Sequence, residues 1–157
     1  MLAVYQQVLS VANLMTMLLH CSAPSCSVAT QVVVCGVPGA MTPTCSETHL
    51  PGFANLVDEF KAKGVDSVVC ISVNDAFVMN AWKNKLELEG KVDMLADGNA
   101  DFAKAIGCEM DTGAFGGVRL RRLAMLVEDG VVQKIGVEEG GGSTELSDAK
   151  TILAALE

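Results

Sequence analysis

A short run of apolar, mostly β-branched residues, VVVCGV at 32–37, ends at Pro38 and Gly39. A run without polar positions is typical of a strand buried on both faces, and such strands occur in parallel sheets covered by helices. A second run of this kind, VDSVVCISV at 65–73, follows one helical segment later. The two runs therefore predict a βαβ unit in a three-layer α/β domain.

Helical segments are expected after each of these strands. The first starts near Thr44 and contains Pro51, which predicts a kink or a break into two pieces. The second is capped by Asn74 or Asp75. The side chains expected on its buried face are Phe77, Val78, Ala81 and Trp82. A shorter helix at 99–106 is expected to bury Phe102 and Ile106.

The last third of the chain changes pattern. After a short strand at 92–95, the segments 123–127 and 131–137 flank Asp129-Gly130, which predicts an antiparallel hairpin. A terminal helix is expected at 147–156, with Ile152, Leu153 and Leu156 on its apolar side. The order β-α-β-α-β-α-β-β-α predicts an α/β fold with a mixed β-sheet and a C-terminal β-hairpin plus helix. In such sheets ligands bind at the carboxyl ends of the strands.

Charge and length exclude several classes of partner. The 157 residues suit one domain, and 19 acidic residues against 11 basic ones give a formal net charge of -8. Nucleic acids and anionic membranes attract basic surfaces, so neither is expected as a partner. The apolar run at 8–19 is also too short for a membrane span, which needs about 20 residues.

Residues 1–30 form an apolar N-terminal segment that we treat apart from a domain at 31–157. The run VLSVANLMTMLL at 8–19 has the length of a signal-peptide core, but no positive charge precedes it. A helix packed on the domain, a weak targeting segment and an imperfect gene start all remain open. A cytoplasmic location is the first expectation, and an organellar one is the alternative if the segment is a targeting sequence.

The six cysteines are not spaced for metal or for a redox motif. They are Cys21, Cys26, Cys35, Cys45, Cys70 and Cys108. No two of them form CxxC, and neither histidine has ligand spacing to them, so no structural zinc is expected. Cys35 is expected in the core, and Cys108 is expected to be an incidental thiol. A chain of this size folds without disulfides, which favours a reducing compartment.

Cys45 is the candidate nucleophile. It lies in the first turn of a predicted helix just after a buried strand, where free backbone N–H groups and the positive helix end favour a thiolate. Thr42, three residues earlier, offers a hydroxyl that donates and accepts. The chain has one tight basic cluster, Arg119, Arg121 and Arg122. His49 is expected to be a packed or hydrogen-bonded helix residue.

These motifs resemble those of the type II peroxiredoxins, the branch with a thioredoxin-like fold that accepts electrons from glutaredoxin. The spacing P-x-x-x-T-x-x-C runs from Pro38 to Cys45 within VPGAMTPTCSETHLPGF at 37–53. The stretches CISVNDAFVMNAW at 70–82 and GVRLRRLAMLVEDG at 117–130 are also similar to the family. The resemblance covers the chain from about Val32 onward. It departs from the family at Met41, where Phe is usual, and over the first 30 residues.

The resemblance implies a role for each site residue. Cys45 is then the peroxidatic cysteine, Thr42 orients the peroxide, Pro38 shields the sulfur from water, and Arg122 is the active-site arginine. Arg122 has the family's placement, seven residues before Asp129, which leaves Arg119 and Arg121 as surface charges. A helix end stabilises a thiolate by about 0.3–1 kcal/mol, whereas a guanidinium about 4 Å away contributes about 4 kcal/mol before desolvation. The arginine is therefore expected to do most of the activation.

The implied activity is reduction of hydrogen peroxide and alkyl hydroperoxides, with a sulfenic acid at Cys45 as the product. Glutathione with glutaredoxin, or thioredoxin, then restores the thiol, and no metal, haem or flavin cofactor is implied. Cys70 is a possible resolving cysteine, because it matches the second cysteine of plant-like members, and the family suggests a homodimer. Two alternatives remain: a non-catalytic thioredoxin-fold binding or holdase module, and a disulfide oxidoreductase, against which the lack of CxxC counts.

Overall fold

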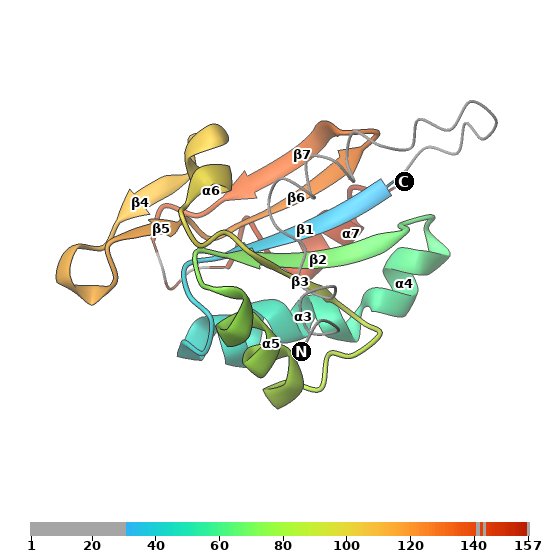
Figure 1. The fold of residues 1–157 in the computed structure, drawn as a ribbon. Coiled ribbons are helices and arrows are strands. Elements are labelled where there is room, and N and C mark those ends of the chain that lie inside the picture. Colours follow the sequence, from blue (N-terminus) through green and yellow to red (C-terminus); the bar gives the residue numbers. More distant parts are fainter. Residues whose placement is uncertain (1–30, 141, 143, 157) are drawn as a thin grey trace, which may run out of the picture.

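The computed structural model describes residues 31–140, 142 and 144–156 (Figure 1). The expectations for the N-terminal segment, including the apolar run at 8–19 and the cysteines Cys21 and Cys26, fall outside the described residues. No helix in the described ranges is long and apolar enough to cross a membrane.

A mixed five-stranded sheet forms the centre of the domain. Its strands lie in the order β3-β2-β1-β6-β7. Their bounds are β1 (Gln31–Val37), β2 (Ser67–Ser72), β3 (Asp93–Ala96), β6 (Leu123–Glu128) and β7 (Val131–Val137). The first three are parallel, β6 runs antiparallel to β1, and β7 closes the predicted hairpin with β6. The predicted mixed sheet is confirmed, with strand ends within two residues of expectation.

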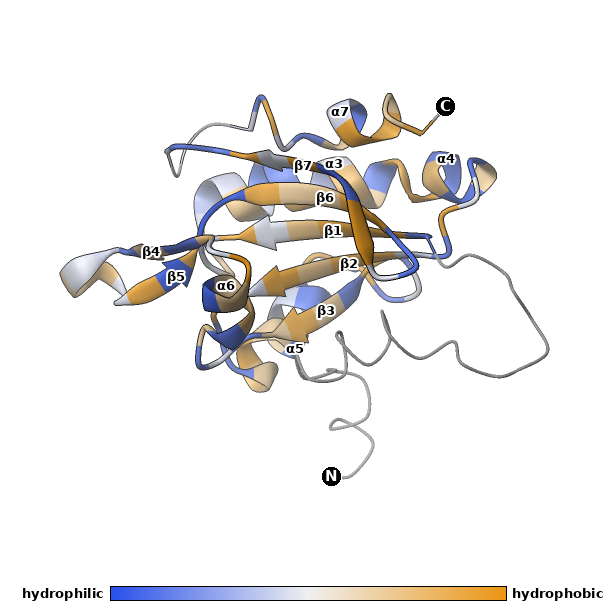
Figure 2. Ribbon diagram, turned by 90° about the horizontal axis from the view of Figure 1, so that it is seen from above, coloured by the Kyte–Doolittle hydropathy of each residue, from blue (hydrophilic) through white to orange (hydrophobic). Residues whose placement is uncertain are grey.

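Helices cover both faces of this sheet (Figures 1 and 2). One face packs on the turn η1 (Cys45–His49) and on α3 (Leu50–Asn55), α4 (Val57–Ala62), α5 (Ala76–Lys85) and α7 (Ala149–Leu153). The other face packs on α6 (Asp101–Ala105). The alternating side chains of β1 supply both apolar clusters, with Val33 and Cys35 on one face and Val32 and Val34 on the other. The three-layer arrangement is confirmed.

The helical segment after β1 is broken, as Pro51 predicts. It opens with the π-helical turn η1, in which the N–H of Leu50 bonds to the carbonyl of Cys45, and the α-helix then breaks at Leu56 between α3 and α4. Pro51 itself lies in the first turn of α3, where its missing N–H costs no intrahelical bond. This irregularity lies at the carboxyl end of β1, where the site residues are.

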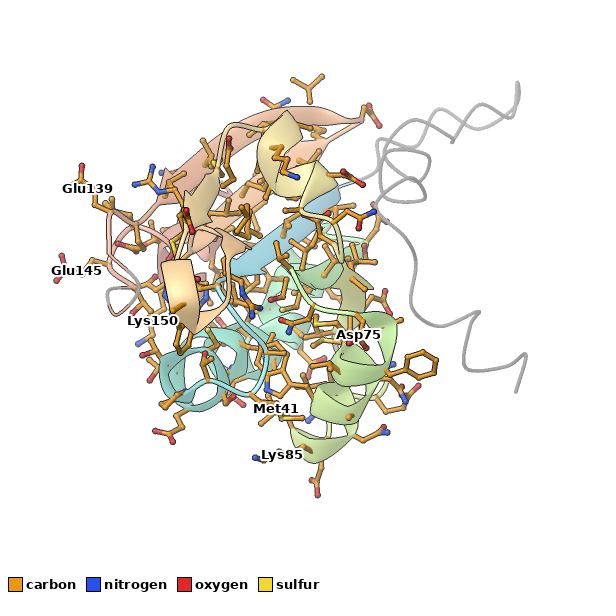
Figure 3. All side chains as sticks on the ribbon, turned by 60° about the vertical axis from the view of Figure 1, so that its left-hand side comes forward. Met41, Asp75, Lys85, Glu139, Glu145 and Lys150 are labelled. Atoms are coloured by element: carbon orange, nitrogen blue, oxygen red, sulfur yellow. The ribbon has the colours of Figure 1, made fainter. Side chains whose placement is uncertain are left out.

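The predicted buried face of α5 is partly wrong. Asp75 caps the helix by accepting from the N–H groups of Phe77 and Val78, and Figure 3 shows Asp75 and Lys85 at its two ends. Starting from this cap, the buried positions are Met79, Trp82 and Lys83, while Phe77 is 65% exposed and Ala81 is also exposed. Ile106 is likewise 36% exposed, because α6 ends one residue before it.

A second, two-stranded sheet was not predicted. The strands β4 (Glu109–Asp111) and β5 (Val118–Leu120) pair in antiparallel fashion around a 3-10 turn at Gly113–Phe115. Three-residue strands are too short to show a period, so the sequence indicated only a loop. The hairpin projects from the sheet beside the carboxyl end of β1 (Figure 1), and it forms one wall of the site.

Candidate active site

Cys45 begins η1 and is fully buried. The N–H of Ser46, the next residue, donates to the carbonyl of Thr42 across 2.9 Å and so fixes the path of the chain on both sides of Cys45. The indole N–H of Trp82 on α5 donates to the Ser46 hydroxyl across 3.0 Å. The turn that carries the sulfur is therefore tied both to the preceding loop and to a neighbouring helix.

Arg122 reaches Cys45 because β6 runs antiparallel to β1. Leu123, the first residue of β6, pairs with Gly36 near the end of β1, so the residue just before β6 arrives beside the active-site turn. The Arg122 Nη2 donates to Cys45 Sγ at 3.5 Å, and the side chain is 2% exposed. A guanidinium in this position can stabilise negative charge that moves to or from the sulfur during a reaction. Of the three arginines in the cluster, the structure brings this one to the sulfur.

A cavity of about 320 Å³ has Arg122 in its wall. Pro38, Thr42 and Thr44 of the loop line one side, Met110 and Phe115 of the β4–β5 hairpin line another, and Arg122 lies at its wall. The Thr42 hydroxyl donates to the carbonyl of Gly39 across 2.9 Å. Because its proton is used in this bond, the oxygen lone pairs are left to accept from a ligand in the cavity.

Arg119 is not the surface charge that the sequence suggested. Its side chain is half-buried and lines the same cavity. Its Nη1 donates to the carbonyl of Val73 at 2.8 Å, and its Nε donates to the carbonyl of Gly116 at 3.0 Å. A Cβ at Gly116 would lie 2.5 Å from this guanidinium, so glycine is needed for the close approach. Arg119 therefore joins the hairpin to the end of β2.

Asn74 is a site residue that sequence reasoning considered only as a helix cap. Its Oδ1 accepts from the N–H of Ala40 at 3.0 Å and from the Ser72 hydroxyl at 2.8 Å. These bonds hold the loop after β1, in which Met41 takes a left-handed φ of 66°. Figure 3 shows Met41 at the surface between α3 and α5. The signal that identifies Asn74 is its place just after β2, where the carboxyl ends of parallel strands meet.

Three further titratable side chains lie on the same face of the sheet. Cys35 on β1 and Cys70 on β2 are register partners, and His49 ends the turn that Cys45 begins. The Cys35 Sγ lies 3.6 Å from His49 Nδ1, and His49 Nε2 lies 2.8 Å from the Ser147 carbonyl oxygen. His49 is thus a buried, hydrogen-bonded residue, as expected. Cys35 lies in the core, but it has polar partners there.

The charges in this group follow from its contacts. Burial disfavours a charge on Cys35, but a hydrogen bond from Cys70 and the charge of His49 outweigh it and lower the pKa of the Cys35 thiol to about 5. Burial also disfavours the imidazolium, but the Cys35 thiolate raises the pKa of His49 above its ordinary value. Burial, together with Cys35, raises the pKa of Cys70 well above its ordinary value. Cys35 and His49 therefore form the ionised pair, and Cys70 stays a thiol.

Cys108 lies on the opposite face of the sheet, in the apolar cluster that includes Phe102 of α6. Burial raises the pKa of its thiol. Its position keeps it away from Cys45, which fits the expectation of a thiol without a part in the site.

Comparison with known proteins places the chain in a family. The sequence profile of the Redoxin family matches residues 27–153. Peroxiredoxin-2C from Oryza sativa subsp. japonica is 48% identical over 127 residues, which are 80% of this chain and 78% of that protein. The chloroplastic peroxiredoxin-2E-2 of the same plant is 52% identical over 130 residues, but the chain covers only 57% of its length. The chain covers 55% of the chloroplastic peroxiredoxin-2E of Arabidopsis thaliana.

A solved structure agrees with these relatives. The crystal structure of reduced Prx3 in complex with H₂O₂ from Vibrio vulnificus is 55% identical, with a TM-score of 0.78. The match covers 82% of this chain and 81% of that one. The arrangement of Pro38, Thr42 and Arg122 around one cavity, with Cys45 in contact with Arg122, thus occurs in a chain that belongs to the Redoxin family, as a plant-like type II peroxiredoxin.

Proposed function

We propose that this chain is a thiol peroxidase that uses Cys45 to reduce hydrogen peroxide and alkyl hydroperoxides. The observation that carries the proposal is the 3.5 Å contact between Arg122 Nη2 and the Cys45 sulfur, with Arg122 also in the wall of a cavity of about 320 Å³. The relative from Vibrio vulnificus was solved with hydrogen peroxide, which supports the same substrate for this chain.

The reaction follows from the groups around the cavity. The Cys45 thiolate attacks the terminal oxygen of the hydroperoxide, the O–O bond breaks, and the second oxygen leaves as water or an alcohol after taking a proton. The Thr42 oxygen accepts from the O–H of the substrate and orients it for attack. Arg122 stabilises the negative charge that moves from sulfur to the leaving oxygen. Cys45 is left as a sulfenic acid.

The cavity wall favours hydroperoxides with an apolar group. Met110 and Phe115 of the β4–β5 hairpin face the cavity together with Pro38. Apolar side chains remove an alkyl chain from water and gain roughly 25 cal/mol per Å² buried. We therefore expect an alkyl hydroperoxide such as cumene hydroperoxide to have a lower KM than hydrogen peroxide.

An external thiol closes the cycle in this proposal. Glutathione with glutaredoxin is the first candidate and thioredoxin the second, with no metal or organic cofactor. Cys45 is fully buried, so η1 must open before a thiol as large as glutathione reaches the sulfur. Cys70, on the same face of the sheet, is a possible internal partner. A homodimer is the expected assembly, and Phe115, 76% exposed, is a side chain that a second copy would cover.

An organellar location is favoured over the cytoplasmic one that was expected first. Two relatives that are 52% and 47% identical are chloroplastic peroxiredoxins. Fluorescence microscopy of the full chain fused at its C-terminus to a fluorescent protein tests this, and a diffuse cytosolic signal in plant cells would contradict it.

Peroxide consumption with two serine variants tests the activity. Cys45→Ser is expected to abolish consumption, and Cys108→Ser, its matched control on the other face of the sheet, is expected to keep it. The parent chain consuming no peroxide, while suppressing aggregation of an unfolded client protein, would replace this proposal by the holdase alternative.

A further inference from the structure

Two cysteines that the proposed reaction does not need lie side by side under Cys45. Cys35 and Cys70 are register partners on the neighbouring parallel strands β1 and β2. Both are fully buried, in the apolar cluster that also contains Cys45. Neighbouring strands lie about 4.8 Å apart, and a disulfide accepts Cα separations of about 4.4–6.8 Å. The backbone is therefore already spaced for a bond between these two sulfurs.

His49 supplies a base to one member of the pair. Its Nε2 lies 2.8 Å from the carbonyl oxygen of Ser147, and a carbonyl only accepts, so Nε2 carries a proton. The other ring nitrogen, Nδ1, therefore faces the Cys35 sulfur at 3.6 Å and is free to take the thiol proton. Cys35 is thus placed as an attacking thiolate, whereas Cys70 has no base of this kind.

We propose that Cys35 and Cys70 form a second redox-active pair, which takes the oxidising equivalent from Cys45 and returns Cys45 to the thiolate. The inference rests on the proposed function, because its starting species is the Cys45 sulfenic acid. The electrons move in two steps, each of which forms one S–S bond.

In the first step the Cys70 sulfur attacks the sulfur of the Cys45 sulfenic acid. The S–O bond breaks, and the hydroxide that leaves takes the Cys70 proton and becomes water. In the second step the Cys35 thiolate attacks the Cys70 sulfur, and the Cys45–Cys70 bond breaks. Cys45 leaves as a thiolate beside Arg122, which stabilises its charge. One hydroperoxide has then oxidised two thiols to the Cys35–Cys70 disulfide, and Cys45 is ready to react again.

The electrostatics of the group favour the second step, in which Cys35 is the attacking thiolate. The low pKa of Cys35, about 5, keeps it a thiolate at neutral pH. Burial and the neighbouring Cys35 raise the pKa of Cys70, with a smaller contribution from Cys45, so Cys70 is the thiol of the group. The first step needs η1 to open, so that the Cys45 sulfur moves from Arg122 towards β2. The second step needs no backbone change, because the strands already hold its two sulfurs as neighbours.

The pair would store an oxidising equivalent where solvent does not reach. A sulfenic acid that waits for a thiol is exposed to a second peroxide, which converts it irreversibly to sulfinic acid. Transfer to Cys35–Cys70 removes that sulfenic acid. Attack of the Cys45 thiolate on Cys70 later reverses the second step and gives the Cys45–Cys70 bond, which an external thiol reduces.

Mass spectrometry of the full chain tests the transfer. The reduced protein receives one equivalent of cumene hydroperoxide without any thiol, and free thiols are then blocked with iodoacetamide. Cleavage at Met41, Lys61 and Lys63 separates the three cysteines onto different peptides. The expected products are a Cys35–Cys70 disulfide and an alkylated Cys45. The Cys35–Cys70 disulfide must be absent in Cys35→Ala and must still form in the matched control Cys108→Ala.

The stoichiometry of peroxide consumption gives an independent count. Without a thiol, the parent is expected to consume about two equivalents of hydroperoxide, and Cys35→Ala about one. Consumption by the parent together with free thiols at both Cys35 and Cys70 overturns the inference and leaves the proposed function standing. If the parent consumes no hydroperoxide and keeps its Cys45 thiol, both the inference and the proposed function are overturned, because the pair draws its oxidising equivalent from Cys45.

His49→Gln tests whether His49 positions the attacking sulfur. We expect the Cys45–Cys70 bond to accumulate at neutral pH, because the second step slows by at least tenfold. Raising the pH is expected to restore that step as Cys35 loses its proton without help. A slow step that does not recover at high pH would show that His49 acts only in packing, and would overturn its assignment as the base.

Discussion

The indole Nε1 of Trp82 donates to the hydroxyl of Ser46 across 3.0 Å, and Ser46 is the residue that follows Cys45. Trp82 is fully buried on α5, so this bond joins a rigid helix to the turn that must open during the proposed cycle. A buried neutral hydrogen bond contributes about 1 kcal/mol, which corresponds to about a fivefold change in an opening equilibrium.

Trp82→Phe should therefore release the turn without emptying the core. We expect peroxide reduction in a single turnover to change little, because Arg122 and Thr42 are untouched. Formation of the first disulfide, which needs the open turn, should become about fivefold faster. Rapid-quench measurement of peroxide consumption and alkylation time courses follow the two steps. Phe77→Leu is the control, since Phe77 lies on the same helix but is 65% exposed. If the first disulfide forms at the same rate in Trp82→Phe as in the parent, opening of η1 does not limit its formation.

Substitutions of the three arginines in the basic cluster should have different effects on the kinetics of peroxide reduction. Arg122→Gln is expected to lower kcat/KM for peroxide by two or more orders of magnitude, because it removes the cation 3.5 Å from the Cys45 sulfur. Arg119→Gln breaks the bonds to Val73 and Gly116, which should loosen the cavity wall and raise KM more than it lowers kcat. Arg121→Gln is expected to be neutral. If Arg121 proved as important as Arg122, the assignment of the activating cation would be wrong.

Turnover with an external thiol should not depend on Cys70. In the presence of glutaredoxin and glutathione, Cys70→Ser is expected to keep its steady-state rate within a few-fold of the parent, since the external thiol attacks Cys45 itself. The same variant should lose all internal disulfides when peroxide is added alone. Loss of steady-state turnover in Cys70→Ser would make the internal pair an obligatory part of the cycle.

Stability should decline in mild acid through the Cys35–His49 pair. In the folded chain the pKa of Cys35 falls from 9.0 to about 5 and that of His49 rises above 6.5. The Cys35 contribution is present above the unfolded pKa and is lost as pH falls through the folded one, whereas the His49 contribution is full below 6.5. At neutral pH both states bind equal numbers of protons, because one group has gained the proton that the other lost.

Between pH 6.5 and about 5 the unfolded chain binds one proton more than the folded chain. The free energy of unfolding therefore decreases by about 1.4 kcal/mol for each unit by which the pH is lowered. Cys70, which also acts on Cys35, has a raised pKa and keeps its proton throughout this range. Urea unfolding at several pH values measures this slope. The slope should be absent in His49→Gln, because without the imidazolium Cys35 keeps its proton in both states across this range, and an equal slope in that variant would assign it to other groups.

Residues 1–30 are predicted to be dispensable for the chemistry. The residues of the site all lie beyond Val37, and the Redoxin profile begins at residue 27. A chain that starts at Ser27 should keep the kcat/KM of the full chain, as measured on protein shown to be folded by circular dichroism. A folded but inactive truncation would mean that the N-terminal segment contributes to the site.

Local patterns predicted most of the sheet but not the contacts that complete the site. The unbroken apolar runs of β1 and β2 and the Asp129-Gly130 turn are strong local signals, and each gave a strand or a hairpin. The β4–β5 hairpin has three-residue strands without a period, so it gave none. The long-range bond from Arg119 to Val73 depends on that hairpin, which is why the sequence suggested a solvated charge.

The misplaced face of α5 has a different cause. Which side of a helix is buried depends on how the helix packs on the sheet, and here the polar Lys83 is buried while the apolar Phe77 is exposed. The cap was also open in sequence, because Asn74 and Asp75 were equally good candidates. Asp75 caps the helix, which leaves the Asn74 side chain to hold the loop after β1. The choice is made by the tertiary contact with Ala40, a residue 34 positions away that no local pattern reports.

The π-helical turn η1 also fixes the length of the chain at this point. Its bond from Leu50 to the Cys45 carbonyl encloses one residue more than an α-helical turn. Deleting one residue between them would restore α-helical pitch and rotate Cys45 by about 100° relative to the rest of the helix, away from Arg122. Exposed Glu47 can therefore be exchanged freely, whereas an insertion or deletion anywhere in this turn would take the sulfur out of the site.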